Sequence, residues 1–210
     1  KRLKYSRGKQ LGRYAENWHQ KGWLYRDASC AEPNVPGARQ LHGGALGYNN
    51  YLDAEAAQGW TPFILDTNGN GQRDEGYVGP EDTIDPTKDK RINSGLYAVS
   101  PAPDGSVWGS NLSYPGAIMR VVPGDNPSMT ALTEYYELPV DENRDPIEGF
   151  SPRGMDVDRN GVAWVALASG HMASFDRNKC TGPLNGPTAT GQHCPEGWTF
   201  HAEPLPQFKN

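Results

Sequence analysis

The sequence YAVSPAPDGSVW at residues 97–108 can be laid over GMDVDRNGVAW at residues 154–164. Each stretch has a short apolar run, then an Asp-Gly or Asn-Gly pair, and then a second run that ends in tryptophan. Asp-Gly and Asn-Gly supply the positive φ angles that tight hairpins require. The pattern therefore predicts two similar β-hairpins.

A third and a fourth strand are expected after each hairpin. The third runs lie at residues 116–122 and 170–175, and the fourth at residues 132–139 and 197–204. Four-stranded units that recur every 40–60 residues or so are typical of β-propeller blades. We therefore predict an all-β fold, a β-propeller in which Trp108 and Trp164 fill the wedges between blades. The alternative is an irregular β-sandwich.

The N-terminal third shows the outer strands of such units in weaker form. Gly-Trp opens a predicted outer strand at residues 22, 59 and 197. Three to four blades seldom close a ring, so either residues or subunits outside this chain complete it, or the first two blades have lost their inner strands. The predicted blade units are residues 1–28, 34–65, 93–140 and 150–205.

Residues 66–92 form an insertion that begins with DTNGNGQRDEGY, which is typical of a calcium-binding loop. Oxygen-bearing side chains alternate along it, and a glycine stands at the sixth position, where the chain must turn sharply. Ca²⁺ prefers six to eight oxygen ligands at roughly 2.3–2.6 Å. The predicted Ca²⁺ ligands are Asp66, Asn68, Asn70, Asp74 and, through its backbone carbonyl, Gln72.

The loop is not a complete EF-hand. Tyr77 stands at the twelfth position, where an EF-hand places a bidentate glutamate, and a predicted strand at residues 60–65 precedes the loop instead of a helix. Another carboxylate must therefore complete the shell. The candidates are Glu75, Glu81, Asp82 and Asp85. The alternative is a solvated Asn/Gly turn without an ion.

The composition suits a fold with many turns. The 210 residues include 25 glycines and 18 prolines, and only 36% are hydrophobic, which disfavours a helical bundle. No apolar run approaches the roughly 20 residues that a membrane-spanning helix needs. The net charge of −5 gives no indication of nucleic-acid binding. With no initiator methionine and no signal peptide, the sequence is expected to be a mature chain or a fragment.

The three cysteines indicate a single disulfide. Cys180 and Cys194 bracket a segment rich in Gly, Pro, Thr and Asn that has little means of ordering itself. A bond between them is expected, with two free thiols as the alternative, and Cys30 would then pair outside this sequence. A disulfide together with calcium favours a periplasmic or extracellular location.

Residues 93–205 resemble the streptogramin lyase (virginiamycin B lyase-like) and gluconolactonase-type propellers. The resemblance rests on Asp/Asn-Gly-x-x-Trp in both hairpins, on Gly116-x-hydrophobic-x-Arg120, and on the run from Thr133 to Pro139. Residues 59–209 are similar to larger uncharacterised bacterial proteins that are expected to be exported. The resemblance implies the propeller fold more firmly than any activity.

The catalytic residues of these enzymes do not carry over. The lyase group has axis-lining His and Glu residues before the first strand and just after the Trp. The gluconolactonase group has a metal-binding Asp in Pro-Asp-Gly, where this chain has Pro152-Arg153-Gly154. The lyase positions hold neither His nor Glu here: they are Gly95, Leu96, Pro152, Arg153, residues 109–111 and residues 165–167.

Arg153 is the strongest candidate for ligand binding. The start of a first strand points at the central channel of a propeller, where a guanidinium would bind a carboxylate, sulfate or phosphate. The alternative is a salt bridge to Asp156, to Glu148 or to a neighbouring blade. His42, beside Gly43 and Gly44, is a weaker candidate for a channel-lining base.

The expected function is that of an exported, calcium-stabilised β-propeller that acts as a binding scaffold for a small anionic ligand or a protein partner. The alternative is a lyase or lactonase-type enzyme with a rearranged site that uses Arg153 and His42. Whether the chain is an enzyme stays open at this point. A third possibility is a subunit bound within a larger assembly.

Overall fold

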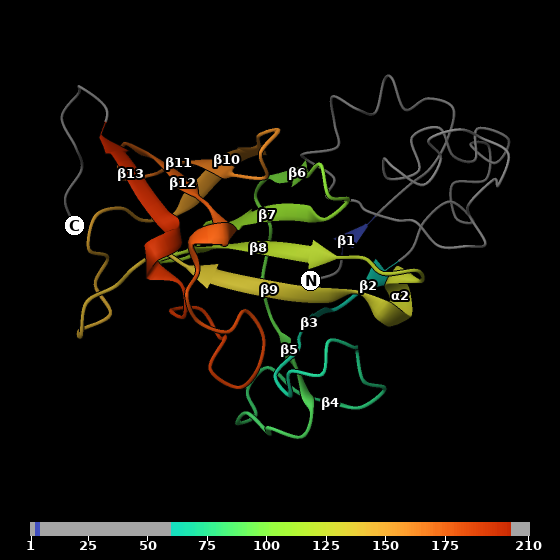
Figure 1. Cartoon of the computed structure of the whole chain (residues 1–210). Coiled ribbons are helices and arrows are strands. Elements are labelled where there is room, and N and C mark those ends of the chain that lie inside the picture. Colours follow the sequence, from blue (N-terminus) through green and yellow to red (C-terminus); the bar gives the residue numbers. More distant parts are fainter. Residues whose placement is uncertain (1–2, 5–59, 203–210) are drawn as a thin grey trace, which may run out of the picture.

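The computed structural model describes residues 3–4 and 60–202, which form a mostly β structure (Figure 1). Two four-stranded antiparallel sheets lie at its centre, and a three-stranded mixed sheet and a two-stranded pair accompany them. The all-β prediction is confirmed. The sheets in this part of the chain do not join into a closed ring.

The first four-stranded sheet is a meander in which each strand pairs with the next. Its strands are β6 (Val99–Pro101), β7 (Val107–Asn111), β8 (Ala117–Val122) and β9 (Leu132–Glu137), with the short helix α2 (Pro127–Thr130) before β9. The second sheet repeats this order. It contains β10 (Pro152–Val157), β11 (Ala163–Leu167), β12 (His171–Phe175) and β13 (Trp198–Ala202), with the 3-10 turns η2 (Arg177–Lys179) and η3 (Pro195–Gly197) before β13.

The hairpin turns form as the sequence predicts. Asp104 Oδ1 accepts the Ser106 backbone N–H at 2.9 Å, and Asp158 Oδ1 accepts the Asn160 N–H at 2.8 Å. The glycines that follow have φ angles of 83° at Gly105 and 82° at Gly161. Side chains with a Cβ rarely adopt this left-handed region, so the two glycines fix the positions of the turns.

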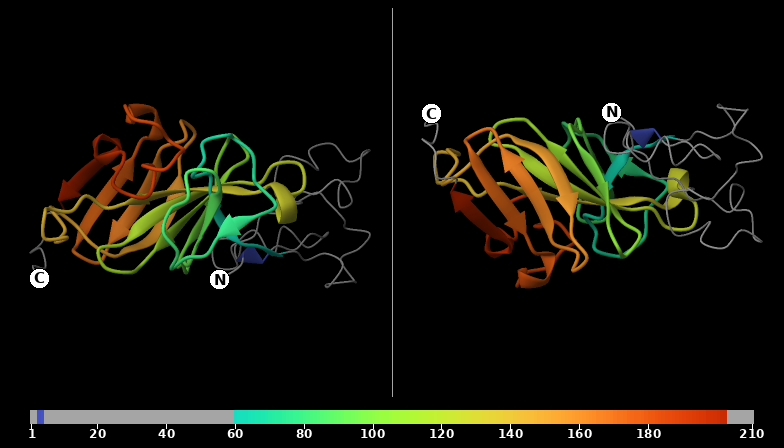
Figure 2. Two further views of the ribbon diagram at one scale, coloured as in Figure 1. Left: turned by 90° about the horizontal axis from the view of Figure 1, so that it is seen from below. Right: turned by 90° about the horizontal axis from the view of Figure 1, so that it is seen from above.

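An aromatic cluster joins the two sheets, which lie side by side in Figure 2. Trp108 on β7 and Tyr136 on β9 are stacked with ring centroids 6.1 Å apart. Phe175 on β12 lies 4.4 Å from Tyr136 and 5.0 Å from Trp198 on β13. All four side chains are buried, so the core lies between the sheets and not within either one.

Only one of the two hairpin tryptophans fills a wedge. Trp108 is 2% exposed and faces the second sheet, whereas Trp164 is 38% exposed. The Trp164 Nε1 donates to Asp158 Oδ2 at 3.1 Å, and the ring stacks on His201. The prediction for Trp164 is wrong for a simple reason: no further sheet covers that face of β11 in the described part of the chain.

The two tryptophans should therefore differ sharply in their contribution to stability. Trp108→Ala should lower the free energy of unfolding by about 3–5 kcal/mol, because it opens a cavity in the shared core. Trp164→Ala, the matched control, should cost less than about 1 kcal/mol. Urea unfolding of both variants measures the difference, and equal losses would show that the Trp164 face is covered in solution.

The insertion contributes two strands to a third sheet, and the strand just before the insertion provides the other. The strands of this sheet are β3 (Phe63–Leu65), β4 (Tyr77–Val78) and β5 (Asp89–Ile92), with β5 in the middle, antiparallel to β3 and parallel to β4. β3 is buried and packs against β9. β2 (Trp60–Thr61) pairs with β1 (Leu3–Lys4). Residues 5–59, which include most of the predicted units 1–28 and 34–65, are outside the described part of the chain.

A buried carboxylate ties the sheets together electrostatically. Glu134 on β9 accepts from Arg120 Nη1 at 2.9 Å and from Arg177 Nε and Nη2 at 2.7 Å each. It also accepts the Tyr136 hydroxyl at 2.7 Å. Arg120 comes from β8 and Arg177 from the turn after β12, so both sheets bind one carboxylate. The hydrogen bonds from Arg177 to Glu134 raise the pKa of Arg177.

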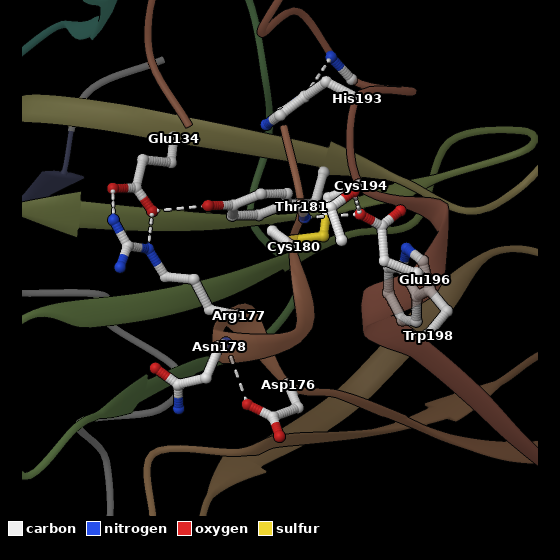
Figure 3. Close-up of a disulfide and its surroundings, with 12 residues drawn as sticks. Glu134, Asp176, Arg177, Asn178, Cys180, Thr181, His193, Cys194, Glu196 and Trp198 are labelled. Atoms are coloured by element: carbon white, nitrogen blue, oxygen red, sulfur yellow. Dashed lines mark hydrogen bonds and ion pairs between the residues drawn. A yellow bond between two sulfur atoms is a disulfide. The ribbon is translucent and has the colours of Figure 1, made fainter. Parts of the chain in front are cut away.

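Cys180 and Cys194 form the predicted disulfide, with Cα atoms 5.1 Å apart (Figure 3). Cys194 is buried in the aromatic core. Closing a loop of about 15 residues contributes roughly 3 kcal/mol in the chain-entropy model. The bond fixes a segment that makes few regular backbone contacts of its own. Cys30 lies outside the described residues.

Stability should fall in acid partly through Asp104. Burial favours a higher pKa for Asp104, but hydrogen bonds from Ser106 and Arg120 outweigh it and lower the pKa to about 2. Because the folded pKa lies below the ordinary 3.8, this stabilisation is present above about pH 4 and is lost as the pH falls toward 2. The melting temperature of Asp104→Asn should therefore drop less than that of the wild type between pH 4 and pH 2.

Asp125→Asn is the matched control for this measurement, because Asp125 is exposed on the turn after β8. Its acid profile should follow that of the wild type. An Asp104→Asn profile with the same steepness as the wild type would contradict the assignment.

Candidate metal centre

The predicted calcium loop is wound around the carboxylate of Asp66. This residue follows the buried strand β3 and is 2% exposed. Its Oδ1 accepts the backbone N–H groups of Gly69 at 2.7 Å and Asn70 at 3.1 Å, and its Oδ2 accepts that of Gly71 at 2.8 Å. Gly69 and Gly71 both have φ of 75°, which lets the chain turn tightly around the carboxylate.

The other predicted ligands converge on the same loop. Asn68 Nδ2 donates to Asp74 Oδ2 at 2.5 Å, and Asn70 Nδ2 donates to Asp74 Oδ1 at 3.2 Å. Gln72 is exposed, and its backbone N–H donates to Asn70 Oδ1 at 2.7 Å. The structure thus brings together Asp66, Asn68, Asn70 and Asp74, with Gln72 at the next position of the turn.

A fifth side chain, which the sequence analysis missed, reaches the loop from β5. Asp89 is fully buried, and its Oδ2 accepts the backbone N–H of Asp74 at 2.8 Å. Its Oδ1 is buried without a hydrogen-bond partner. Burial raises the pKa of Asp89 to about 6, and the nearby carboxylates of Asp74 and Asp66 add to this rise. In the sequence, Asp89 is separated from the loop by 14 residues and looks like one of several exposed charges.

The carboxylates proposed from sequence to complete the shell lie elsewhere. Asp82 Oδ2 accepts the Gly79 N–H at 2.6 Å, and Asp85 Oδ1 accepts the N–H and hydroxyl of Thr87. Glu75 and Glu81 are exposed. These four residues were candidates because they follow the loop closely in the sequence. The parallel pairing of β4 and β5 brings Asp89 to the loop instead.

The donors in this loop are all oxygen atoms. In the described ranges, no three His, Cys, Asp or Glu side chains lie close enough together to form a metal cluster by themselves. The candidate centre is instead a mixed one, with carboxylates, amide oxygens and a backbone carbonyl. Asp66 and Asp89 both bind backbone N–H groups of the loop.

The other two predicted site residues do not join this centre. Arg153 on β10 is exposed, and its guanidinium carbon lies 5.9 Å from the centroid of the Tyr97 ring. Asp156, one of its expected partners, instead accepts the Ser100 hydroxyl at 2.5 Å. His42 lies outside the described residues.

No helix among the described residues has the length and apolar character needed to cross a membrane.

Comparison with known proteins finds similarity for the N-terminal part of the chain. The family model for the AICARFT/IMPCHase bienzyme matches residues 1–62. The bifunctional purine biosynthesis protein PurH of Cutibacterium acnes is 54% identical over 46 residues, which are 22% of this chain and 8% of that protein. PurH of Limosilactobacillus reuteri is 53% identical over 49 residues, 23% of this chain and 10% of its own. No solved structure matches.

These matches overturn the family expected from the sequence. The streptogramin lyase-like resemblance is wrong as an identification, because the family model that matches is a different one and lies in residues 1–62. The exported propeller scaffold, and with it the lyase or lactonase alternative, is wrong for the same reason. A short strand, β2, does begin at Trp60, directly after Gly59, and the Gly-Trp pair at residue 22 lies outside the described residues.

The chain spans about a tenth of the length of the curated relatives that it matches. The match to the family model ends at residue 62, and the strand β3 begins at residue 63.

Proposed function

We propose that residues 1–62 give this chain a part in purine biosynthesis, as a segment of the AICAR transformylase/IMP cyclohydrolase type. The observation that carries the proposal is identity of about one half, 54% over 46 residues and 53% over 49, to proteins named for that pathway.

The charge distribution supports this proposal. Residues 1–62 contain nine Lys or Arg and five Asp or Glu, a formal charge of +4, whereas the remaining residues carry −9. AICAR and IMP are ribonucleotides and carry a phosphate. Arg and Lys are the side chains that bind phosphate most effectively, so the basic segment suits such a ligand and the acidic remainder does not.

The segment is too short to perform the reactions of its relatives alone. It corresponds to 8–10% of those proteins, and an active site of that class needs groups from the rest of the enzyme. We therefore propose that the segment contributes binding of the ribonucleotide, and that the catalytic groups come from residues outside this chain.

The test is equilibrium binding of AICAR and of IMP to the full chain, measured by calorimetry at low salt. The combined variant Arg13→Gln and Arg39→Gln should bind at least about tenfold more weakly, since one charged hydrogen bond contributes roughly 1.5–3 kcal/mol. The matched control, Arg91→Gln with Arg159→Gln, removes two exposed arginines from the β structure and should leave binding unchanged.

Turnover assays complete the test. The full chain alone should show no formyl transfer or cyclisation. Adding a PurH that lacks the corresponding segment should restore part of the activity. Absence of binding to both ribonucleotides would overturn the proposal, and so would equal losses in the two pairs of arginine variants.

For the β structure, we infer that the two four-stranded sheets are successive propeller-like blades. The inference is supported by their identical strand order and by the contact of β10 with both β6 and β7. The face of the first sheet that carries Trp108 packs on Ala163 and Val165 of the second. The corresponding face of the second sheet carries the half-exposed Trp164, in the position where a following blade would pack.

A further inference from the structure

We propose that Asp89 completes a Ca²⁺ site in the loop from Asp66 to Asp74, with the buried Oδ1 of Asp89 as the ligand that closes the shell. The proposal concerns the β structure and does not depend on the role proposed for residues 1–62. It changes the ligand set expected from the sequence, because the closing carboxylate comes from β5 and not from the residues that directly follow the loop.

The first argument is the unpaired buried oxygen. Asp89 is 0% exposed and its Oδ1 has no hydrogen-bond partner, while Oδ2 is held by the backbone of Asp74. A carboxylate buried without full pairing is costly, and proteins normally satisfy it with a hydrogen bond, a cation or a metal. The hydrogen bond through Oδ2 fixes the side chain so that it faces the loop.

The second argument is the excess of negative charge. Asp66, Asp74 and Asp89 lie close enough for their charges to interact. None of the ion pairs in the described part of the chain involves any of the three. The positive charge of Arg73 acts on Asp89, but Arg73 Nη1 donates its hydrogen bonds to the Thr61 hydroxyl and the Ser128 carbonyl. A bound cation would neutralise most of this charge.

The third argument is the chemistry of the donor set. Three carboxylates, the amide oxygens of Asn68 and Asn70, and the carbonyl of Gln72 provide six oxygens and neither sulfur nor imidazole. Zn²⁺ favours Cys and His, and Mg²⁺ keeps several waters and a strict octahedral geometry. Ca²⁺ accepts six to eight oxygens on a flexible loop, so the set fits Ca²⁺ best.

Binding requires a rearrangement of the loop side chains, because the carboxylates of Asp66, Asp74 and Asp89 must come closer together than they are in the structure. The amide groups of Asn68 and Asn70 now donate to Asp74, and each must rotate so that its oxygen faces the ion. The contacts of Asp66 with three backbone N–H groups already hold the loop in its turn. The ion would thus replace the amide–carboxylate hydrogen bonds of Asn68 and Asn70 with Asp74.

The site would also be linked to the disulfide-closed segment. The Asp66 carbonyl accepts the Gly186 N–H at 2.7 Å. A Cβ added to Gly69 would be in van der Waals contact with the Cα of Gly186, at 3.7 Å. Gly186 is between Cys180 and Cys194. An ion that stabilises the loop at Asp66 therefore also stabilises the packing of the segment between Cys180 and Cys194 against this loop.

The experiment is a titration of the chelator-treated full chain with CaCl₂, followed by calorimetry and by melting temperature. The wild type should bind one Ca²⁺ and melt at a higher temperature in its presence, with a much smaller effect of MgCl₂. Asp89→Asn keeps the shape of the side chain and an oxygen for the Asp74 N–H. It should bind Ca²⁺ at least about tenfold more weakly, the loss expected from one charged ligand.

Glu81→Gln is the matched control, because it removes the same charge from an exposed residue of the same insertion. It should bind Ca²⁺ like the wild type. If Asp89→Asn does not fold, Asp74→Asn takes its place with the same expectation. Wild-type protein that binds no Ca²⁺ up to about 10 mM, beyond the weakest natural sites, would overturn the proposal. Unchanged binding by the ligand variant would do so too.

Discussion

The described structure depends on the aromatic contact between two four-stranded sheets. Neither sheet has a core of its own, because each is a single layer that must bury one face against another element. Trp108 and Tyr136 from one sheet and Phe175 and Trp198 from the other provide that burial. The ion pairs of Glu134 join side chains from both sheets, and the disulfide packs into the same core through Cys194.

The strands could be predicted from sequence because their signals are local. Asp104-Gly105 and Asn160-Gly161 fix two turns, and the apolar runs on either side follow from them. Asp89 could not be found in this way, since its role depends on the pairing of β5 with β4 and on complete burial. The predicted burial of Trp164 is wrong for a related reason. Burial of a side chain on a sheet depends on a neighbouring sheet, and a sequence motif does not show which neighbour is present.

The N-terminal segment shows a different limit of local patterns. Short aromatic and glycine motifs at residues 22 and 59 suggested strands, whereas similarity over some 50 residues relates the segment to purine-biosynthesis enzymes. The two parts of the chain also differ chemically. The first is basic, and the second is acidic and contains a disulfide, a bond found mainly in proteins of oxidising compartments. Function must therefore be sought separately for each part.

The measurement that tests the account of the β structure most directly is hydrogen exchange of the full chain with and without Ca²⁺. The account predicts slower exchange on adding Ca²⁺ in three places that the site connects: the loop at residues 66–74, the strand at residues 89–92, and the disulfide-closed segment around Gly186. Exchange in β10 and β11 should stay the same. Exchange that is unaffected by Ca²⁺ in the loop, or slowed equally in every strand, would contradict it.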